Sequence, residues 1–117
     1  MKYVEICNEY FKVFSNKDIS KLSEMFEDAS VLRDWNKTFN GKQEVIKENK
    51  NIFDSVETIQ ALPKFQASTI SHELGIATVF NEIDVVINGG EETLFVIDVI
   101  DIDLETNLIK SVRAYKG

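Results

Sequence analysis

The hydrophobic pattern changes its period near residue 57, and this change constrains the fold more than any other feature of the sequence. Before it, apolar residues recur every three or four positions, which is typical of amphipathic helices. After it, they fall into long alternating or continuous apolar segments, which are typical of strands. Helices followed by sequential strands predict an α+β fold. Because short turns separate the strands, we expect a strongly curved antiparallel sheet.

Three helices are expected in the first half of the chain. The first should end near residues 15–16, and its buried stripe comprises Tyr3, Cys7, Tyr10 and Phe14. Asp18 is a suitable N-cap for the second helix. Asn40 and Gln43 resemble a capping box that opens the third. Between the second and third helices we expect a short β-leaning segment, 29–33, and a turn-rich loop, 34–41.

The second half predicts four strands separated by three turns. The strands are expected at 58–73, 76–88, 93–103 and 108–115. Pro63 interrupts the first of them, and its missing N–H predicts either a sheet edge or a bulge. The chain has 117 residues, which is the length of one domain. We therefore expect a single domain spanning residues 1–117.

The composition argues against several classes of partner. Twenty Asp and Glu against 13 Lys and Arg give a net charge of −7, which disfavours nucleic acid and anionic membrane surfaces. One Cys and one His leave no internal disulfide and no Cys- or His-rich metal site. No apolar run is long enough to span a membrane, and Glu5 and Glu9 lie where a signal peptide would be apolar. These features predict a cytoplasmic protein without a metal.

Asp98 stands on an apolar face of the predicted strand 93–103. Side chains alternate along a strand, so Asp98 shares its face with Val96 and Ile100 and is the only ionisable group there. Burying its charge would cost several kcal/mol, so the group must be paired, hydrated in a cavity, or protonated. A structural ion pair with a cation such as Arg113 and a border on solvent are the plainer interpretations.

Two other polar residues have both a structural and a functional interpretation. Asp34 ends the short β-leaning segment beside Trp35, where it can form a turn or act as an acid or base. Tyr10 lies on the stripe of the first helix, and its buried hydroxyl needs a hydrogen-bond partner. Cys7 shares that stripe and is expected to be an inert thiol.

Several stretches resemble the ketosteroid isomerases of the SnoaL-like, or nuclear transport factor 2-like, superfamily. They are YFKVFSNKDI at 10–19, MFEDASVLRD at 25–34, GKQEV at 41–45, VIDV at 96–99 and IKSVRAY at 109–115. The resemblance covers nearly the whole chain and is weakest between residues 55 and 78. It implies a cone-like, cystatin-like α+β roll, in which three N-terminal helices pack into a curved antiparallel sheet.

The resemblance also implies a catalytic site. The family's general base falls on Asp34, and its two oxyanion-binding groups, a tyrosine and a protonated aspartic acid, fall on Tyr10 and Asp98. Trp35 and Phe39 would lie at the rim of the pocket, or simply pack in the core. Five further residues are expected to line the pocket: Phe14, Asn49, Phe53, Val96 and Ile100.

The sequence departs from the family in ways that affect the ligand. Trp35 replaces a proline that often follows the base, and Phe26 and Asn49 occupy the positions of two further tyrosines of the hydrogen-bond network. The sequence ends at Gly117 without the family's C-terminal extension. These departures favour a ligand that is smaller than a steroid or different from one.

The implied function is a cofactor-free isomerase that moves an allylic proton through an enolate. The ligand would be an apolar small molecule with a carbonyl or phenolic oxygen. A SnoaL-like cyclase or dehydratase and a non-catalytic ligand-binding module remain alternatives. We also expect a homodimer, because the other face of strand 93–103 carries an apolar patch of Phe95, Ile97 and Val99 that three helices on the opposite face would not cover.

Overall fold

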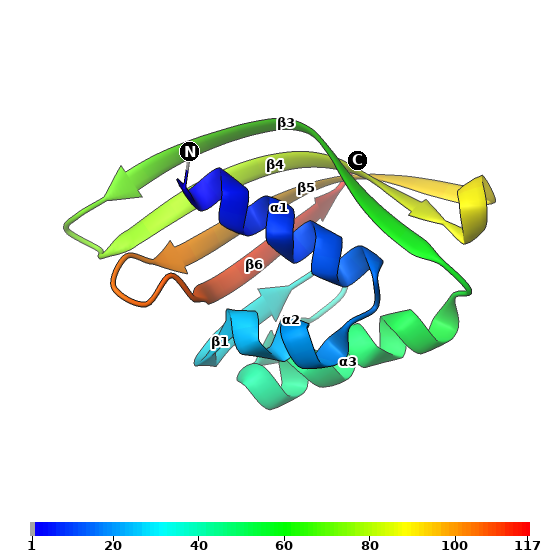
Figure 1. Cartoon of the computed structure of the whole chain (residues 1–117), viewed down its shortest axis with the longest axis horizontal. Coiled ribbons are helices and arrows are strands. Elements are labelled where there is room, and N and C mark those ends of the chain that lie inside the picture. Colours follow the sequence, from blue (N-terminus) through cyan, green and yellow to red (C-terminus); the bar gives the residue numbers. More distant parts are fainter. Residues whose placement is uncertain (1) are drawn as a thin grey trace.

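Six strands form one curved sheet, and three helices pack against it (Figure 1). The computed structural model describes residues 2–117. The elements follow in the order α1 (Lys2–Ser15), α2 (Ile19–Met25), β1 (Phe26–Arg33), β2 (Thr38–Asn40), α3 (Lys42–Ser55), β3 (Ile59–Ser71), β4 (Ile76–Ile87), the short 3₁₀ helix η1 (Asn88–Gly90), β5 (Glu92–Asp103) and β6 (Ile109–Lys116). The predicted α+β class with three N-terminal helices and a curved sheet is confirmed.

The sheet is mixed, which corrects the expectation of a wholly antiparallel one. Its strand order is β2-β1-β6-β5-β4-β3, and β1 runs parallel to β6 while every other neighbouring pair is antiparallel. A parallel pair needs a long crossover between its strands. The whole segment from β2 to β5 provides it here. Hydrophobic alternation predicts strands but does not reveal such a pairing between the two ends of the chain.

Of the two predicted helix N-caps, one is confirmed and the other is wrong. Asp18 is the N-cap of α2, and its carboxylate accepts a hydrogen bond from the N–H of Lys21 at 3.2 Å. The predicted capping box of α3 is wrong, because the N-cap is Gly41, whose φ of +88° favours glycine. Glu44 instead accepts a hydrogen bond from the N–H of Asn40. The expected loop 34–41 also contains β2, which pairs with β1.

Pro63 lies both at a sheet edge and at a bulge, so both expectations for it are met. It belongs to β3, the last strand of the sheet, and the register with β4 shifts between Pro63 and Phe65. A residue without an N–H is accommodated at such a place because no ladder bond is lost.

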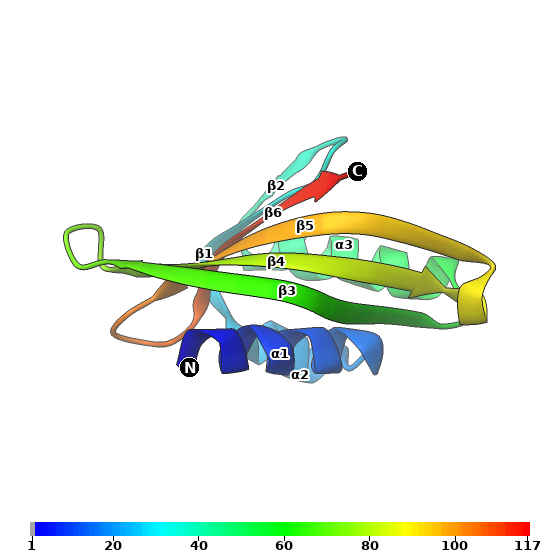
Figure 2. The same ribbon diagram turned by 90° about the horizontal axis from the view of Figure 1, so that it is seen from above.

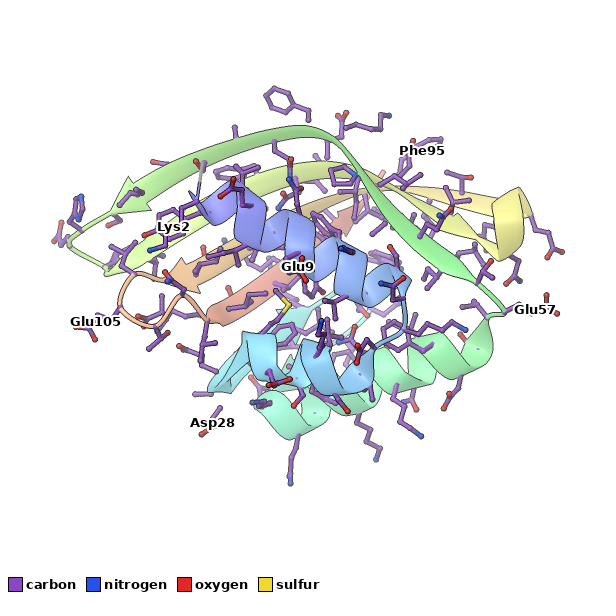
Figure 3. All side chains as sticks on the ribbon, in the orientation of Figure 1. Lys2, Glu9, Asp28, Glu57, Phe95 and Glu105 are labelled. Atoms are coloured by element: carbon purple, nitrogen blue, oxygen red, sulfur yellow. The ribbon has the colours of Figure 1, made fainter. Side chains whose placement is uncertain are left out.

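The two faces of the sheet have different surroundings. Figure 2 shows α1 and α2 along one side of the long strands, and the inward residues of β4 and β5 are buried there with α1. On the outer face, Phe80, Phe95, Ile97 and Tyr115 are 45–59% exposed. Phe95 is labelled in Figure 3. The helices thus leave an apolar outer face open.

Candidate ligand-binding and active site

A cavity of about 310 Å³ lies between α1, α3, the loop after β1 and the inner face of the sheet. This volume is at the lower end of the ~300–1,000 Å³ that is typical of small-molecule sites. The apolar wall includes Leu32, Ile83, Val85, Leu94, Val96 and Val112. The polar groups on the wall come from Tyr10, Asp34, Asn36, Glu48, Asn49, Ser55 and Asp98. A few polar groups in an apolar wall are the usual composition of a ligand site.

The structure places the three predicted catalytic residues on the wall of this one cavity. Tyr10 comes from α1, Asp34 from the loop after β1, and Asp98 from the middle of β5. Four of the other predicted pocket residues also line it, namely Phe14, Trp35, Asn49 and Val96. Trp35 is half exposed, as expected for a residue at the rim.

Phe39, Phe53 and Ile100 do not line the cavity, which corrects the expectation for these three. The Phe53 ring packs against that of Phe14, with centroids 5.1 Å apart, and Ile100 is fully buried in the core. Phe39 lies on β2, where the Lys37 ammonium group is 5.2 Å from its ring centroid. Periodicity predicts which face a side chain occupies, but not how far along that face the cavity extends.

Sequence reasoning missed part of the wall. Ile83 and Val85 lie on the inward side of β4, beside Val96 and Leu94 of β5. The alternation of the predicted strand 76–88 contained this signal. No sequence signal pointed to Glu48, because it precedes Asn49 on α3 and lies outside the apolar stripe.

Asp98 is buried without a cation. Its residue is 8% exposed, and its carboxyl group forms no hydrogen bond or ion pair within residues 2–117. Arg113 pairs with Asp101 instead, so the structural ion pair considered for Asp98 is wrong for that cation. Burial away from water raises the pKa of Asp98 to about 7. Near neutral pH this group can therefore carry a proton and donate it in a hydrogen bond.

Tyr10 presents an unused hydroxyl close to Asp98. The residue is 4% exposed, and its ring packs edge-on against Phe26 with centroids 5.8 Å apart. Burial, and next the negative charge of nearby Asp98, raise the pKa of Tyr10, so the hydroxyl stays protonated. It makes no hydrogen bond with any residue of 2–117 and is free to donate one to a ligand. Burial likewise raises the pKa of Cys7 to about 12, which keeps the thiol protonated.

Asp34 fulfils both interpretations that the sequence left open. Its Oδ1 accepts hydrogen bonds from the backbone N–H groups of Asn36 and Lys37, both at 2.8 Å, which makes it a turn former. Asp34 also lines the cavity. Because the turn uses only Oδ1, the other carboxylate oxygen is available to a ligand.

Asn81 on β4 is paired with Asp98 on the neighbouring strand β5, and the sequence analysis did not identify it. It is fully buried, and its amide donates hydrogen bonds to the backbone oxygens of Asp98 at 3.1 Å and Val79 at 3.2 Å. Gln66 donates to the Asn81 amide oxygen at 2.9 Å. These bonds hold the backbone of β5 behind the Asp98 side chain. The sequence signal that could have identified Asn81 is a polar residue among the apolar residues of the inward face of strand 76–88.

The described residues provide neither a metal site nor a membrane-spanning helix. Within residues 2–117, no group of three or more His, Cys, Asp or Glu side chains is arranged to hold a metal ion. No helix in that range is long and apolar enough to cross a membrane.

Residues 4–97 match the profile of the SnoaL-like domain, so the chain belongs to the SnoaL-like family. No curated protein matches the sequence significantly. The fold is similar to that of a candidate dehydratase of the NTF2-like family from Streptomyces avermitilis, with a TM-score of 0.86, 15% identity, and coverage of 99% of this chain and 94% of that one.

Two further solved structures have a similar fold. Nuclear transport factor 2 from Cryptosporidium parvum gives a TM-score of 0.83 at 17% identity, covering 97% of this chain and 90% of that one. A candidate isomerase of the SnoaL-like family from Agrobacterium tumefaciens gives 0.77 at 10% identity, covering 100% and 99%. At these identities the likeness shows the fold alone. The match to the SnoaL-like domain confirms the superfamily that the sequence predicted.

Proposed function

We propose that the protein is a cofactor-free isomerase that moves a proton next to a carbonyl group in an apolar small molecule. One observation carries the proposal: Tyr10, Asp34 and Asp98 line a single apolar cavity, and the side chains of Tyr10 and Asp98 have no polar partner within residues 2–117. Neither group is among the fully enclosed side-chain atoms that lack a partner, so both open into the cavity. A ligand oxygen in the cavity can therefore accept a hydrogen bond from each of them.

The chemistry divides the three residues into a base and two donors. The Asp34 carboxylate takes a proton from the carbon next to the carbonyl, and the electrons of that C–H bond form a dienolate. Asp34 then returns the proton to another carbon of the same dienolate, so no atom is gained or lost. Tyr10 and protonated Asp98 donate hydrogen bonds to the enolate oxygen. In a dry, preorganised site each such donor contributes roughly 3 kcal/mol to the transition state.

The test is an isomerisation assay with small β,γ-unsaturated cyclic ketones of one and two rings. Conjugation of the double bond with the carbonyl is followed by ultraviolet absorbance. We expect catalysed turnover by the wild-type protein and a loss of about 10²–10⁴-fold in Asp34→Asn, which is the contribution of a positioned general base. Equal rates for the two proteins, across the ketone series, would overturn the isomerase proposal.

The outer face of the sheet supports a homodimer. Its exposed aromatic and aliphatic side chains are Phe80, Phe95, Ile97 and Tyr115, and Ile97 is paired with Tyr115 on one side and with Glu82 on the other. Exposed apolar side chains gathered on a sheet face typically mark an interface, and association of two copies through this face would remove them from water. A cytoplasmic location stays a prediction from the composition.

A further inference from the structure

The cavity wall is rich in carboxyl groups and contains no basic side chain among the described lining residues. Asp34, Glu48 and Asp98 all contribute to it. Such a wall repels anionic ligands, and a buried anion would have no cation with which to pair. The charge of the wall therefore selects against carboxylates and phosphates.

Asn49 offers a further polar group on the helix side of the cavity. The residue is 2% exposed, lies on α3, and lines the cavity. Its Nδ2 donates to the backbone oxygen of Val45 at 2.8 Å, which fixes the orientation of the amide. Its carbonyl oxygen Oδ1 receives no hydrogen bond from any residue of 2–117. This oxygen is not among the fully enclosed side-chain atoms that lack a partner, so it opens into the cavity and is available to a ligand as an acceptor.

The polar groups of the cavity that lack a partner come from three elements. Asp98 lies on β5, Tyr10 on α1 and Asn49 on α3. The first two can donate a hydrogen bond, whereas the amide oxygen of Asn49 can only accept one. A molecule that satisfies all three needs an acceptor oxygen and, at a separate position, a donor.

We propose that the ligand is uncharged and carries, besides its carbonyl or phenolic oxygen, a second polar group that donates a hydrogen bond to Asn49 Oδ1, a hydroxyl being the simplest case. This inference rests on the proposed function, because that function places the first oxygen at Tyr10 and Asp98. Asn49 is thus the residue that distinguishes a hydroxylated ligand from a purely apolar ketone.

The test measures binding by isothermal titration calorimetry at pH 6. The probes are 2-naphthol, a set of dihydroxynaphthalene positional isomers, and 6-hydroxy-2-naphthoate. For the wild-type protein we expect at least one diol to bind about tenfold more tightly than 2-naphthol, the gain from one additional hydrogen bond. The naphthoate is expected to bind at least tenfold more weakly than 2-naphthol.

Two variants separate the inference from the proposed function. Asn49→Leu should remove the preference for the diol, so that the ratio of the diol affinity to the 2-naphthol affinity falls to about one. Tyr10→Phe should weaken 2-naphthol and the diols alike. Thermal unfolding monitors the fold of both variants, and the wild-type ligand series tests the proposal even if Asn49→Leu does not fold.

Each contrary result has a distinct meaning. If no diol gains over 2-naphthol, if the naphthoate binds as well as 2-naphthol, or if the diol preference survives in folded Asn49→Leu, the inference is overturned. Equal weakening of all probes in that variant means a structural role for Asn49 and also overturns it. If Tyr10→Phe leaves 2-naphthol unaffected, or 2-naphthol does not bind at all, the proposed function fails and the inference with it.

Discussion

Arg113 pairs with Asp101, its Nη1 lying 2.5 Å from Asp101 Oδ2, on the face of the sheet opposite to the Asp98 side chain. The two aspartates are three residues apart on β5 and therefore face opposite sides of the sheet. Thr78 and Ser111 also donate to the Asp101 carboxylate. Arg113 of β6 thus binds a carboxylate on the outer face. The carboxyl group of Asp98 faces the cavity on the inner face and has no ion-pair partner there.

Replacing Asp98 should stabilise the protein in alkaline solution. Its pKa is about 7 in the folded state, above the ~3.9 of an unfolded aspartate, because burial penalises the charge. The wild-type protein is therefore most stable below about pH 4 with respect to this group, and loses stability as the pH rises to about 7. The loss is bounded at roughly 4 kcal/mol. Asp98→Asn cannot ionise, so urea unfolding should show the two proteins equal near pH 4 and the variant more stable at pH 8.

An ionised structural role for Asp98 would give the contrary result, with Asp98→Asn less stable than the wild type at both pH values. The amide keeps the shape of the side chain, so the comparison does not introduce a cavity.

The affinity for a phenolic ligand should fall above pH 7. Ionisation of Asp98 removes a hydrogen-bond donor and places a negative charge beside the ligand oxygen. The dissociation constant of 2-naphthol should therefore rise by up to about tenfold for each pH unit above the pKa of Asp98. Asp98→Asn should bind the ligand with a flat pH profile between pH 6 and 9, and a wild-type profile that is equally flat would show that Asp98 does not contact the ligand oxygen.

Two substitutions at Asp34 should separate its turn from its chemistry. Asp34→Asn retains an oxygen that can accept from the N–H groups of Asn36 and Lys37, so its thermal stability and its affinity for 2-naphthol should match or exceed those of the wild type. Asp34→Ala loses those bonds and should be destabilised by about 1 kcal/mol. Both should isomerise the ketones about 10²–10⁴-fold more slowly than the wild type. Weaker naphthol binding by Asp34→Asn would mean that the carboxylate serves in binding rather than in proton transfer.

Asp101 is a matched control for Asp98, because its pKa is shifted in the opposite direction. Although its partial burial acts to raise the pKa of Asp101, the hydrogen bonds from Arg113, Thr78 and Ser111 lower it overall. Its contribution to stability is present above the unfolded pKa of ~3.9 and is lost as the pH falls further. Asp101→Asn should cost about 1–2 kcal/mol at pH 7 and less at pH 3, measured by urea unfolding, with no change in naphthol affinity. A stabilised variant at pH 7 would contradict the ion pair.

A charged residue introduced at the centre of the outer face should prevent two copies from associating. Ile97 lies at the centre of the exposed apolar face, between Glu82 of β4 and Tyr115 of β6. Ile97→Arg should sediment as a monomer at a concentration where the wild type is a dimer. Glu105→Arg, at the tip of the turn after β5 (Figure 3), is the control and should remain dimeric. A monomeric wild type at high micromolar concentration would refute the dimer.

The sequence predicts local structure well where one pattern determines it. The alternation around Asp98 predicted its burial on an apolar face, and the stripe of α1 predicted the inward position of Tyr10. Each follows from a fixed geometry, two residues per repeat in a strand and 3.6 in a helix. The place of Asp34 on the cavity wall came from the family resemblance, because its loop has no period.

Features that depend on distant parts of the chain were not predictable in this way. The parallel pairing of β1 with β6 joins segments that are separated in the sequence by α3, η1 and the other four strands, and no local pattern encodes it. Asn49 and Phe53 share one stripe of α3, but only Asn49 reaches the cavity. Which of them does so depends on the tilt of α3 against the sheet, and tilt is set by packing.

The edges of the sheet limit how copies of this protein can meet. At one end, β2 is only three residues long. At the other, Pro63 and the bulge beside it divide the 13 residues of β3, and Lys64 adds a charge at the same point. Neither margin presents a long, flat row of free backbone groups that could template another chain. Lateral growth into an extended cross-β assembly is thereby discouraged, even though the molecule exposes aromatic side chains on the broad side of the same sheet.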